Sequence, residues 1–291
     1  ITAQKQSPYS KMSQNELALQ FFGAGFFNPQ MADQALACLD MMDFDRKQFI
    51  MQKIAQNGGM YQQMLAMQQQ MVMLAQMVDK GCEYCFMECS SHAIVQRRIF
   101  GIHFAGALFT NLTHDHLDYH KTFAEYIRAK KIFFDELSKD SFAIVNSDDR
   151  NGLVMLQNTA AQTFTLSLRS HADFCCKILE STVEGMLLRI DNSDVWVSFL
   201  GRFNAYNLLT VYAAAVKLGF ERSEVLRCLS MLTPVDGRFD IVRAADGTIA
   251  IIDYAHTPDA LENILKTVAE IRTKNQSVTT ICGCGGERDT T

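Results

Sequence analysis

Residues 141–149 read SFAIVNSDD, a short apolar run that ends in a cluster of polar side chains. This pattern predicts a strand with polar residues at its carboxyl end. Upstream, ALFTNL (107–112) is another short apolar run, and downstream the segment 172–199 alternates like short strands. NAYNLLTVYAAAVKLGF (204–220) predicts a helix closed by Gly219. Strands that alternate with helices predict an α/β fold with a mostly parallel, doubly wound sheet.

Ligands of such sheets bind where strands end, so polar residues just after strands are the most informative ones. Four further segments complete the prediction. A helix with proline at its start is expected over PDALENILKTVAEIR (258–272). FDIVRAADGTIAIIDYA (239–255) predicts a hairpin with a type I′ turn at Asp246-Gly247. CEYCFMEC (82–89) and SVTTICGCGG (277–286) are each expected to form a strand, the second running into a glycine turn.

Length and composition restrict the class of protein. The 291 residues suffice for roughly two domains of about 150 residues each. The chain is 48% hydrophobic and 20% charged, so it can bury a sizeable core. A net charge of −5 argues against non-specific binding to nucleic acid or to anionic membranes. The polar first twenty residues, the lack of a long apolar run and nine scattered cysteines predict a cytosolic protein with reduced thiols and no membrane insertion.

The first 78 residues differ from the rest in composition. They hold 11 of the 15 methionines and 15 glutamines, and Met and Leu recur at helical spacing. We expect helices here, broken once at Asn57-Gly58-Gly59, at roughly 13–22, 29–43, 44–56 and 60–78. The methionine stripe is interpreted as a helix-packing face or coiled-coil-like seam, in preference to an adaptable docking surface. This segment loosely resembles the C-terminal tail of phage portal proteins.

Two segments around residue 85 carry candidate ligands. Glu88 ends an apolar run and is followed by Ser90, Ser91 and His92. A carboxylate at the end of a strand can hold Mg²⁺ near phosphates, but an ordinary turn with serine as the helix N-cap explains the same spacing slightly better. Zinc is the alternative for the pairs Cys82/Cys85 and Cys282/Cys284, although buried small residues are the favoured interpretation.

The stretch NLTHDHLDYHKTFAEYIRAKK (111–131) contains three histidines, and a lysine lies on its apolar helix face. Lys130 shares the helical stripe of Phe123, Tyr126, Ile127 and Phe134, whereas Lys131 points away. Desolvation on such a face lowers the pKa of a lysine and favours the neutral amine. That amine could be a nucleophile, a base or a CO₂ acceptor whose carbamate binds a metal, unless the side chain snorkels to the surface. His114 and His120 are expected to be solvated bystanders.

From about residue 80 onward, the chain resembles the Mur ligases, and among them the diaminopimelate-adding (MurE) type. The resemblance covers some 210 residues. It rests on ordered motifs: ECSSHAIVQRR, TNLTHDHLDYH, AEYIRAKKIFF, GRFNAYNLL, VDGRFD, IIDYAHTPDALE and CGCGGERD. It implies ATP-dependent peptide-bond formation in peptidoglycan precursor synthesis. The carboxylate of a UDP-MurNAc-dipeptide becomes an acyl phosphate, and the amine of the incoming diamino acid then displaces phosphate, with Mg²⁺ neutralising phosphate charge.

The same resemblance assigns roles to individual residues. Glu88 resembles the ligand of one Mg²⁺, and His116 with a carbamylated Lys130 resembles the group around the second. Ser90, Gln96 and Arg98 resemble the contacts to the UDP-muramoyl substrate. Arg288 resembles the arginine that meets the carboxylate of the diamino acid. The remaining matches resemble ATP contacts: Asn204, Asn207, Arg238, Asp253, Tyr254 and His256.

Several departures from the family pattern shape the expectations. The sequence contains no G-x-x-x-x-G-K-[ST] phosphate loop, and the family's uridine-binding domain has no counterpart in residues 1–78. We therefore expect a chimeric or truncated chain that is inactive by itself. Its expected parts are a helical appendage (1–79), an incomplete central ATP-binding domain (80–236) and the start of a Rossmann-like C-terminal domain (237–291). Diaminopimelate is favoured over lysine. The alternatives are a folylpolyglutamate synthase-like ligase and a docking protein that acts through residues 1–78.

Overall fold

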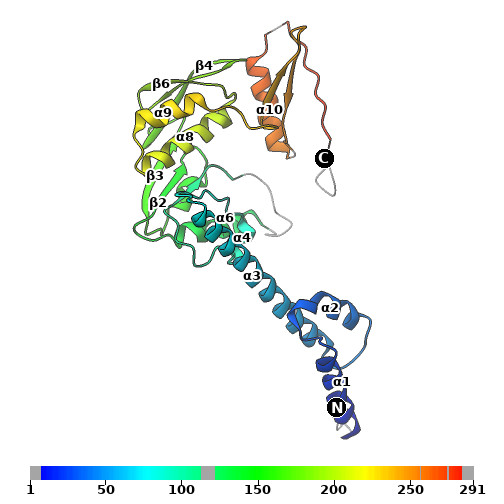
Figure 1. The fold of residues 1–291 in the computed structure, drawn as a ribbon. Coiled ribbons are helices and arrows are strands. Elements are labelled where there is room, and N and C mark those ends of the chain that lie inside the picture. The colour runs from blue at the N-terminus through cyan, green and yellow to red at the C-terminus, as the bar shows by residue number, and fades with distance from the viewer. Residues whose placement is uncertain (1–7, 113–121, 256, 274, 284–291) are drawn as a thin grey trace. The chain divides into compact units, whose positions relative to one another are not determined.

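The computed structural model describes the chain except for residues 1–7, 113–121, 256, 274 and 284–291 (Figure 1). The chain divides into two compact units, residues 1–102 and 103–291, and each is described by itself. This division falls after the composition change near residue 79. The domain limits predicted from the sequence therefore stay a proposal.

Unit 1 is helical. It contains α1 (Pro8–Gly23), the 3₁₀ turn η1 (Pro29–Met31), α2 (Ala32–Asp40), the long α3 (Lys47–Asp79) and the short α4 (Ser91–Val95). Its small core joins α1 and α2 to the start of α3 through Phe21, Leu39 and Ile54.

The predicted helix break at residues 57–59 is wrong, because α3 runs through both glycines without interruption. Gly58 is buried, and a Cβ atom there would lie 2.5 Å from the Cβ of Ala32. A Cβ at Gly59 would meet nothing within 4 Å. Gly58 therefore serves close packing between α3 and α2 and does not end the helix, which overrides the usual weight of glycine as a helix breaker.

The strand expected over 82–89 is also wrong. These residues follow α3 as an extended segment without ladder pairing, and most of their side chains are exposed. An apolar run needs a neighbouring strand to become a strand, and every ladder among the described residues lies in unit 2. The Ser N-cap interpretation is confirmed for the following turn, since the Ser90 Oγ accepts a hydrogen bond from the Ala93 N–H at 3.2 Å.

Unit 2 is built on a six-stranded sheet in the order β1-β2-β3-β4-β5-β6. β1, β2, β3 and β4 run parallel to one another, and β5 and β6 extend the sheet by antiparallel pairing. The strands are Gly106–Phe109, Phe142–Asn146, Gln162–Ser167, Phe174–Thr182, Gly185–Ile190 and Ser193–Val197. The opening stretch SFAIVNSDD thus supplies β2, an inner strand, as predicted.

Helices cover both faces of this sheet, which confirms the α/β expectation. Alternate residues of β2 enter two different cores. Ile144 packs with α8 (Arg202–Lys217) and α9 (Arg222–Met231), whereas Ala143 and Val145 pack with α6 (Phe123–Asp135) and α7 (Gly152–Met155). The predicted stripe of α6 is confirmed, because Phe123, Tyr126, Ile127 and Phe134 all join the second core.

Residues 237–283 hold the hairpin of β7 (Asp240–Arg243) and β8 (Ile249–Ile252), followed by α10 (Pro258–Ile271). The hairpin is confirmed, but its turn is not type I′. Between Arg243 and Ile249, Gly247 alone has a positive φ, 85°. The Gly247 N–H donates to the Ala244 carbonyl, and the Ala244 N–H donates to the Thr248 carbonyl. This is a longer turn closed by a glycine bulge. No strand forms over residues 277–283, contrary to the prediction.

Candidate functional site

The carboxyl end of the parallel strands is organised around one carboxylate. Asp148 follows β2, and its two oxygens accept four hydrogen bonds. The Ser167 hydroxyl and the Leu168 N–H each donate at 2.8 Å, and the Arg169 N–H donates at 3.2 Å. The Tyr206 hydroxyl, on α8, donates at 2.8 Å. Asp148 therefore joins the ends of β2 and β3 to the first turns of α8.

These contacts shift the pKa values of both partners. Burial would raise the pKa of Asp148, but the four donated hydrogen bonds outweigh it and hold that pKa below the ordinary value of 3.8. Burial, followed by the hydrogen bond to Asp148, raises the pKa of Tyr206 to about 12. At neutral pH the pair is therefore a carboxylate that accepts from a neutral phenol.

A second carboxylate fixes the loop that leaves β1. Asp149 accepts from the Leu112 N–H at 3.1 Å and from the Asn151 N–H at 2.8 Å. The Asn146 side-chain amide donates to the Thr110 carbonyl at 2.9 Å. The polar residues at the end of SFAIVNSDD thus hold the loop after β1 as far as Leu112, and the histidine-containing segment 113–121 lies outside the described residues.

Lys130 lies on α6, one turn after Tyr126. Its side chain is half-buried, and its Nζ lies 5.5 Å from the centre of the Tyr126 ring. An amine over an aromatic face is a cation–π arrangement that removes part of its water shell. Its neighbour Lys131 instead forms an ion pair with Asp135 and a hydrogen bond to the Gln157 carbonyl. The two adjacent lysines thus have different partners. The prediction that Lys131 points away is wrong, because its side chain is only 15% exposed and reaches Asp135 and the Gln157 carbonyl.

Two asparagines begin α8, the helix that Asp148 holds. The Asn204 amide donates to the Leu200 carbonyl at 2.8 Å, and the Asn207 amide is 3.4 Å from the Asn204 Oδ1. The preceding Gly201 has a φ of +86°, and a Cβ there would lie 2.8 Å from the Thr267 Oγ1 of α10. Only glycine fits this entry to the helix, where α10 approaches α8.

The predicted residues of the hairpin region form a connected group. The two oxygens of Asp253 accept from the Phe239 N–H at 2.7 Å and the Ala255 N–H at 2.6 Å. The Arg238 guanidinium lies 5.8 Å from the centre of the Tyr254 ring. Asp253 therefore ties the segment before β7 to the segment after β8, and the pair Arg238–Tyr254 is presented beside it.

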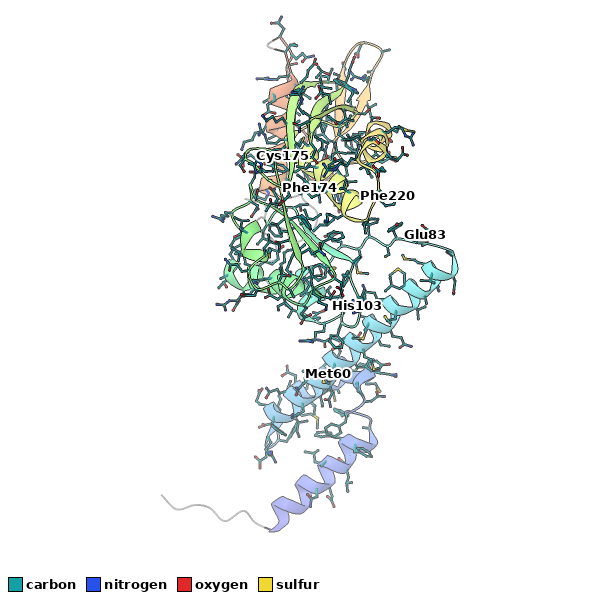
Figure 2. All side chains as sticks on the ribbon, turned by 90° about the vertical axis from the view of Figure 1, so that its left-hand side faces the viewer. Met60, Glu83, His103, Phe174, Cys175 and Phe220 are labelled. Carbon is teal, nitrogen blue, oxygen red and sulfur yellow. The ribbon has the colours of Figure 1, made fainter. Side chains whose placement is uncertain are left out.

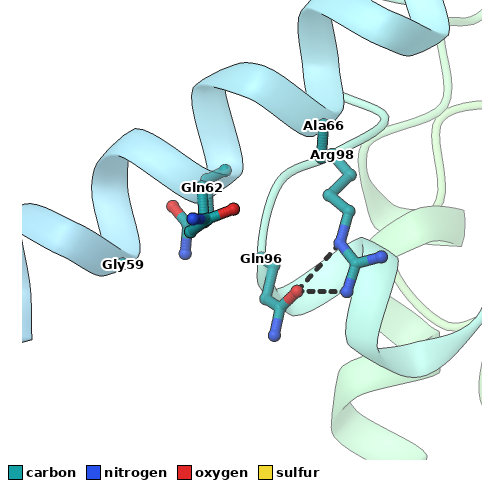
Figure 3. A pocket seen from close by; sticks show the side chains of 6 residues that line it. Gly59, Gln62, Ala66, Gln96 and Arg98 are labelled. Carbon is teal, nitrogen blue, oxygen red and sulfur yellow. Dashed lines mark hydrogen bonds between the residues drawn. The ribbon is translucent and has the colours of Figure 1, made fainter. Parts of the chain in front are cut away.

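The remaining predicted residues lie in unit 1. Glu88 is exposed, and Ser90 caps α4. The Arg98 guanidinium donates through two nitrogens to the Gln96 Oε1, one of them at 2.8 Å (Figure 3). Gln96 and Arg98 line a pocket of about 350 Å³ whose opposite wall is α3, with Gly59, Gln62, Gln63 and Ala66.

The described residues do not form a metal centre by themselves. Among them, no group of three or more His, Cys, Asp or Glu side chains converges. His116, His256, Arg288, His114 and His120 lie outside the described residues or their described side chains. Cys82, Cys85 and Cys282 are exposed free thiols, so the expectation that they are buried is wrong, and Cys284 lies outside the described part. No described helix is long and apolar enough to cross a membrane.

Comparison with known sequences identifies the family. The profile of the Mur ligase middle domain matches residues 52–215, which is more than half of the chain, and that of the Mur ligase glutamate ligase domain matches residues 237–291. The chain belongs to the Mur ligase family. The matched middle-domain region of this Mur ligase chain contains Asp148, Lys130 and the start of α8.

Several of its relatives carry the name UDP-N-acetylmuramoyl-L-alanyl-D-glutamate–2,6-diaminopimelate ligase. The protein from Cytophaga hutchinsonii is 55% identical over 217 residues, which cover 75% of this chain and 44% of the relative. That from Phocaeicola vulgatus is 58% identical over 217 residues, 75% of this chain and 45% of the relative. A solved structure of the same name has a TM-score of 0.55 at 31% identity and covers 69% of this chain and 42% of its own. The chain thus spans less than half of the length of these relatives.

Sequence reasoning about this Mur ligase chain missed the pair Asp148–Tyr206. The two residues are 58 positions apart, so no local spacing connects them. The available signal was the position of Asp148 directly after a buried strand, where polar residues of an α/β sheet gather. That signal placed the carboxylate at the correct edge of the sheet but gave no partner.

Proposed function

We propose that this chain is part of an ATP-dependent ligase that adds a diamino acid to UDP-MurNAc-L-Ala-D-Glu in cytoplasmic peptidoglycan precursor synthesis. The observation that carries the proposal is the 54–58% identity to relatives from Cytophaga, Phocaeicola and Bacteroides species that share one ligase name. Diaminopimelate is the diamino acid in that name, and we prefer it to lysine on this ground. Arg288, which would receive its carboxylate, lies outside the described residues.

Lys130 has a definite chemical task in this proposal. An ammonium group would repel Mg²⁺, whereas a carbamate formed on the neutral amine is an anion with oxygen ligands that suit a hard cation. The Lys130 side chain is half-buried, with its Nζ 5.5 Å from the centre of the Tyr126 ring, and carbamate formation requires its amine to give up a proton before CO₂ adds. When bound, Mg²⁺ neutralises the charge on the phosphates of ATP. His116 is the other proposed ligand of this ion, and Glu88, an exposed carboxylate, is the proposed ligand of a separate Mg²⁺.

The nucleotide side of the proposed site is assigned to α8 and the hairpin region. Asn204 and Asn207 present amides at the start of α8, and Arg238 and Tyr254 present a cation beside an aromatic ring. Such groups can bind a nucleobase or a ribose by hydrogen bonding and stacking. Asp253 already accepts two backbone N–H groups, so we assign it the positioning of this region. His256 completes the proposed set.

The acceptor side is assigned to unit 1. Gln96 and Arg98 form a paired amide and guanidinium at a pocket, just after the short helix α4, and Ser90 caps the start of that helix. A guanidinium fork is suited to carboxylates and phosphates, both of which the UDP-muramoyl dipeptide carries. Arg98 would therefore hold an anionic group of this acceptor while the carboxylate of the acceptor is activated.

A hybrid enzyme tests the proposal. Residues 80–291 replace the segment that they match in the Cytophaga hutchinsonii relative, so that the remaining parts of the ligase are supplied. Phosphate release from ATP is then measured with UDP-MurNAc-L-Ala-D-Glu and either diaminopimelate or lysine. We expect release that requires the UDP substrate and is faster with diaminopimelate. A folded hybrid that releases no phosphate above background with either amino acid contradicts the proposal.

A further inference from the structure

Two sides of α3 are covered within unit 1. On one side, η1 and α2 pack against Ile54 and Gly58, and the Gln30 side-chain amide donates to the Tyr61 hydroxyl at 2.8 Å. This contact involves the first half of α3. Asn57 and Met60 lie on the adjacent face of α3, which η1 and α2 do not cover, and both are exposed.

The segment that follows α3 covers a second side. The Gln70 side-chain amide lies 3.4 Å from the Met87 Sδ. Gly59, Gln62, Gln63 and Ala66 face the pocket that Gln96 and Arg98 line from the other wall (Figure 3). Gln62 lies nearly opposite Met60 and Met64 on the helix, because positions two residues apart differ by about 200°, whereas Gln63 is adjacent to the half-buried Met67 four residues on.

A row of apolar residues occupies the third side. Its members recur at intervals of four and three residues and are Met60, Met64, Met67, Met71, Leu74 and Val78, here called the α3 stripe. Met60, Met64, Met71 and Val78 are 62%, 55%, 52% and 71% exposed, respectively. Met67 and Leu74 are half-buried. Figure 2 shows Met60 on the ribbon of α3. An apolar row of this size is rarely left in water.

The spacing of the α3 stripe indicates what covers it. Alternate steps of four and three residues give a period of 3.5, which two helices share when they supercoil around each other. In this register, Met64, Met71 and Val78 are a positions and Met60, Met67 and Leu74 are d positions. In a coiled coil, each a or d side chain of one helix packs into a hole between four side chains of the other helix, which must have the same repeat. A second copy of α3 has that repeat.

Charge and register agree with an identical partner. No charged residue lies between Lys53 and Asp79, so two copies of this segment meet without repulsion although the whole chain has a net charge of −5. Asn57 is exposed and lies one heptad before Met64, at an a position. A single asparagine at an a position pairs with its own copy and selects a parallel, two-stranded, in-register arrangement.

We propose that the α3 stripe is the interface of a homodimer, a parallel coiled coil in which residues 57–78 of two chains lie side by side. The α3 stripe contains none of the residues proposed for ligation. A failed dimer shows in the mass of the chain and a failed ligase in phosphate release, so the two outcomes are distinguishable.

The mass of the full chain in solution tests the dimer. Light scattering coupled to gel filtration, at loads from about 1 to 100 µM, should show a mass that rises toward twice 32.8 kDa. The double variant Met64→Glu, Met71→Glu places charges at two a positions and should stay monomeric throughout. Gln69→Glu adds the same charge at an exposed f position of the same helix and should dimerise like the unsubstituted chain.

Orientation is tested with a single cysteine. In a parallel, in-register pair Met64→Cys faces its own copy across the interface, so mild oxidation should give a disulfide between the two 64 positions, identified by peptide mass spectrometry. Gln69→Cys should give none above the background of the nine native cysteines. A chain that stays monomeric at the highest load, a dimer that survives the double Glu variant, or a dimer without the 64–64 disulfide would each overturn the proposal.

Discussion

Removal of the Asp148 carboxylate is the perturbation that the structure makes most specific. Asp148→Ala deprives four donors of their acceptor. Two of them keep other partners. The Arg169 N–H also donates to the Ser167 hydroxyl, and the Ser167 Oγ lies 3.1 Å from the Ser170 Oγ. The Leu168 N–H and the Tyr206 hydroxyl are left without their acceptor.

A stranded buried donor costs about 1–3 kcal/mol, and partial access of water to this site favours the lower half of that range. Two such donors therefore predict a loss of about 3 kcal/mol in the free energy of unfolding of unit 2. Asp148→Asn should lose only about 1 kcal/mol, since an amide oxygen can still accept from the Leu168, Arg169 and Tyr206 donors while the charge is gone.

The assay uses the single tryptophan. Trp196 lies on β6 of the same sheet, so its fluorescence in a urea titration reports the unfolding of unit 2. At a slope of about 2–3 kcal/mol per molar urea, Asp148→Ala should lower the midpoint by about 1 M. Asp194→Asn, which breaks an exposed ion pair with Arg189 on the same sheet, is the matched control and should move it far less.

The pH dependence follows from the direction of the shift. The pKa of Asp148 is lowered in the folded chain. The stability that this carboxylate contributes is therefore complete above its unfolded pKa of 3.8 and is lost as the pH falls through its lower folded pKa. The difference in the free energy of unfolding between the unsubstituted chain and Asp148→Asn should therefore be constant near neutral pH and should become smaller below about pH 4. A midpoint of Asp148→Ala within about 0.2 M of the unsubstituted chain would refute the assigned role.

Four other predictions can be checked with the same chain. Gly58→Ala should destabilise unit 1 by about 1–3 kcal/mol because its Cβ would overlap Ala32. Gly59→Ala should stabilise unit 1 by about 0.5–1 kcal/mol, and helix unfolding followed by circular dichroism measures both changes. Gly201→Ala should cost unit 2 about 1–3 kcal/mol in the tryptophan assay, through strain at φ +86° and contact with Thr267, and an unchanged midpoint would contradict this. Burial raises the pKa of Cys176 to about 12, so iodoacetamide at pH 8 should label exposed Cys228 and spare Cys176, as read by mass spectrometry. Burial raises the pKa of Tyr206 to about 12, so its stabilising bond should persist below pH 10 and be lost between pH 10 and 12, a loss absent from Tyr206→Phe.

The parts of the fold with strong periodicity could be predicted from the sequence. The continuous apolar run of β2 is buried on both faces of the sheet, and the stripe of α6 joins one core, because burial of two faces or of one face dictates these two patterns. Predictions that depended on distant partners failed. Gly58 was expected to end a helix, but its missing side chain serves contact with α2, and residues 82–89 had no strand to pair with.

The candidate site divides in the same way. Periodicity placed Lys130 on the apolar stripe of α6, where the structure has it beside Tyr126, but it did not predict that Lys131 is also largely covered, by Asp135 and the Gln157 carbonyl. The hydrogen bond between Asp148 and Tyr206 could not be predicted, because it joins residues that only the folded sheet brings together. Local pattern thus identifies residues with an unusual position, whereas their partners come from topology.

Lys130 is the residue on which the account depends most, because its proposed role needs a covalent change that its neighbour Lys131 does not undergo. The direct measurement is carbon-13 NMR of the chain equilibrated with ¹³C-bicarbonate near neutral pH. We predict a carbamate carbon signal, separate from bicarbonate and dissolved CO₂, that disappears in Lys130→Ala and persists in Lys131→Ala. A spectrum without a signal that depends on Lys130 would contradict the account.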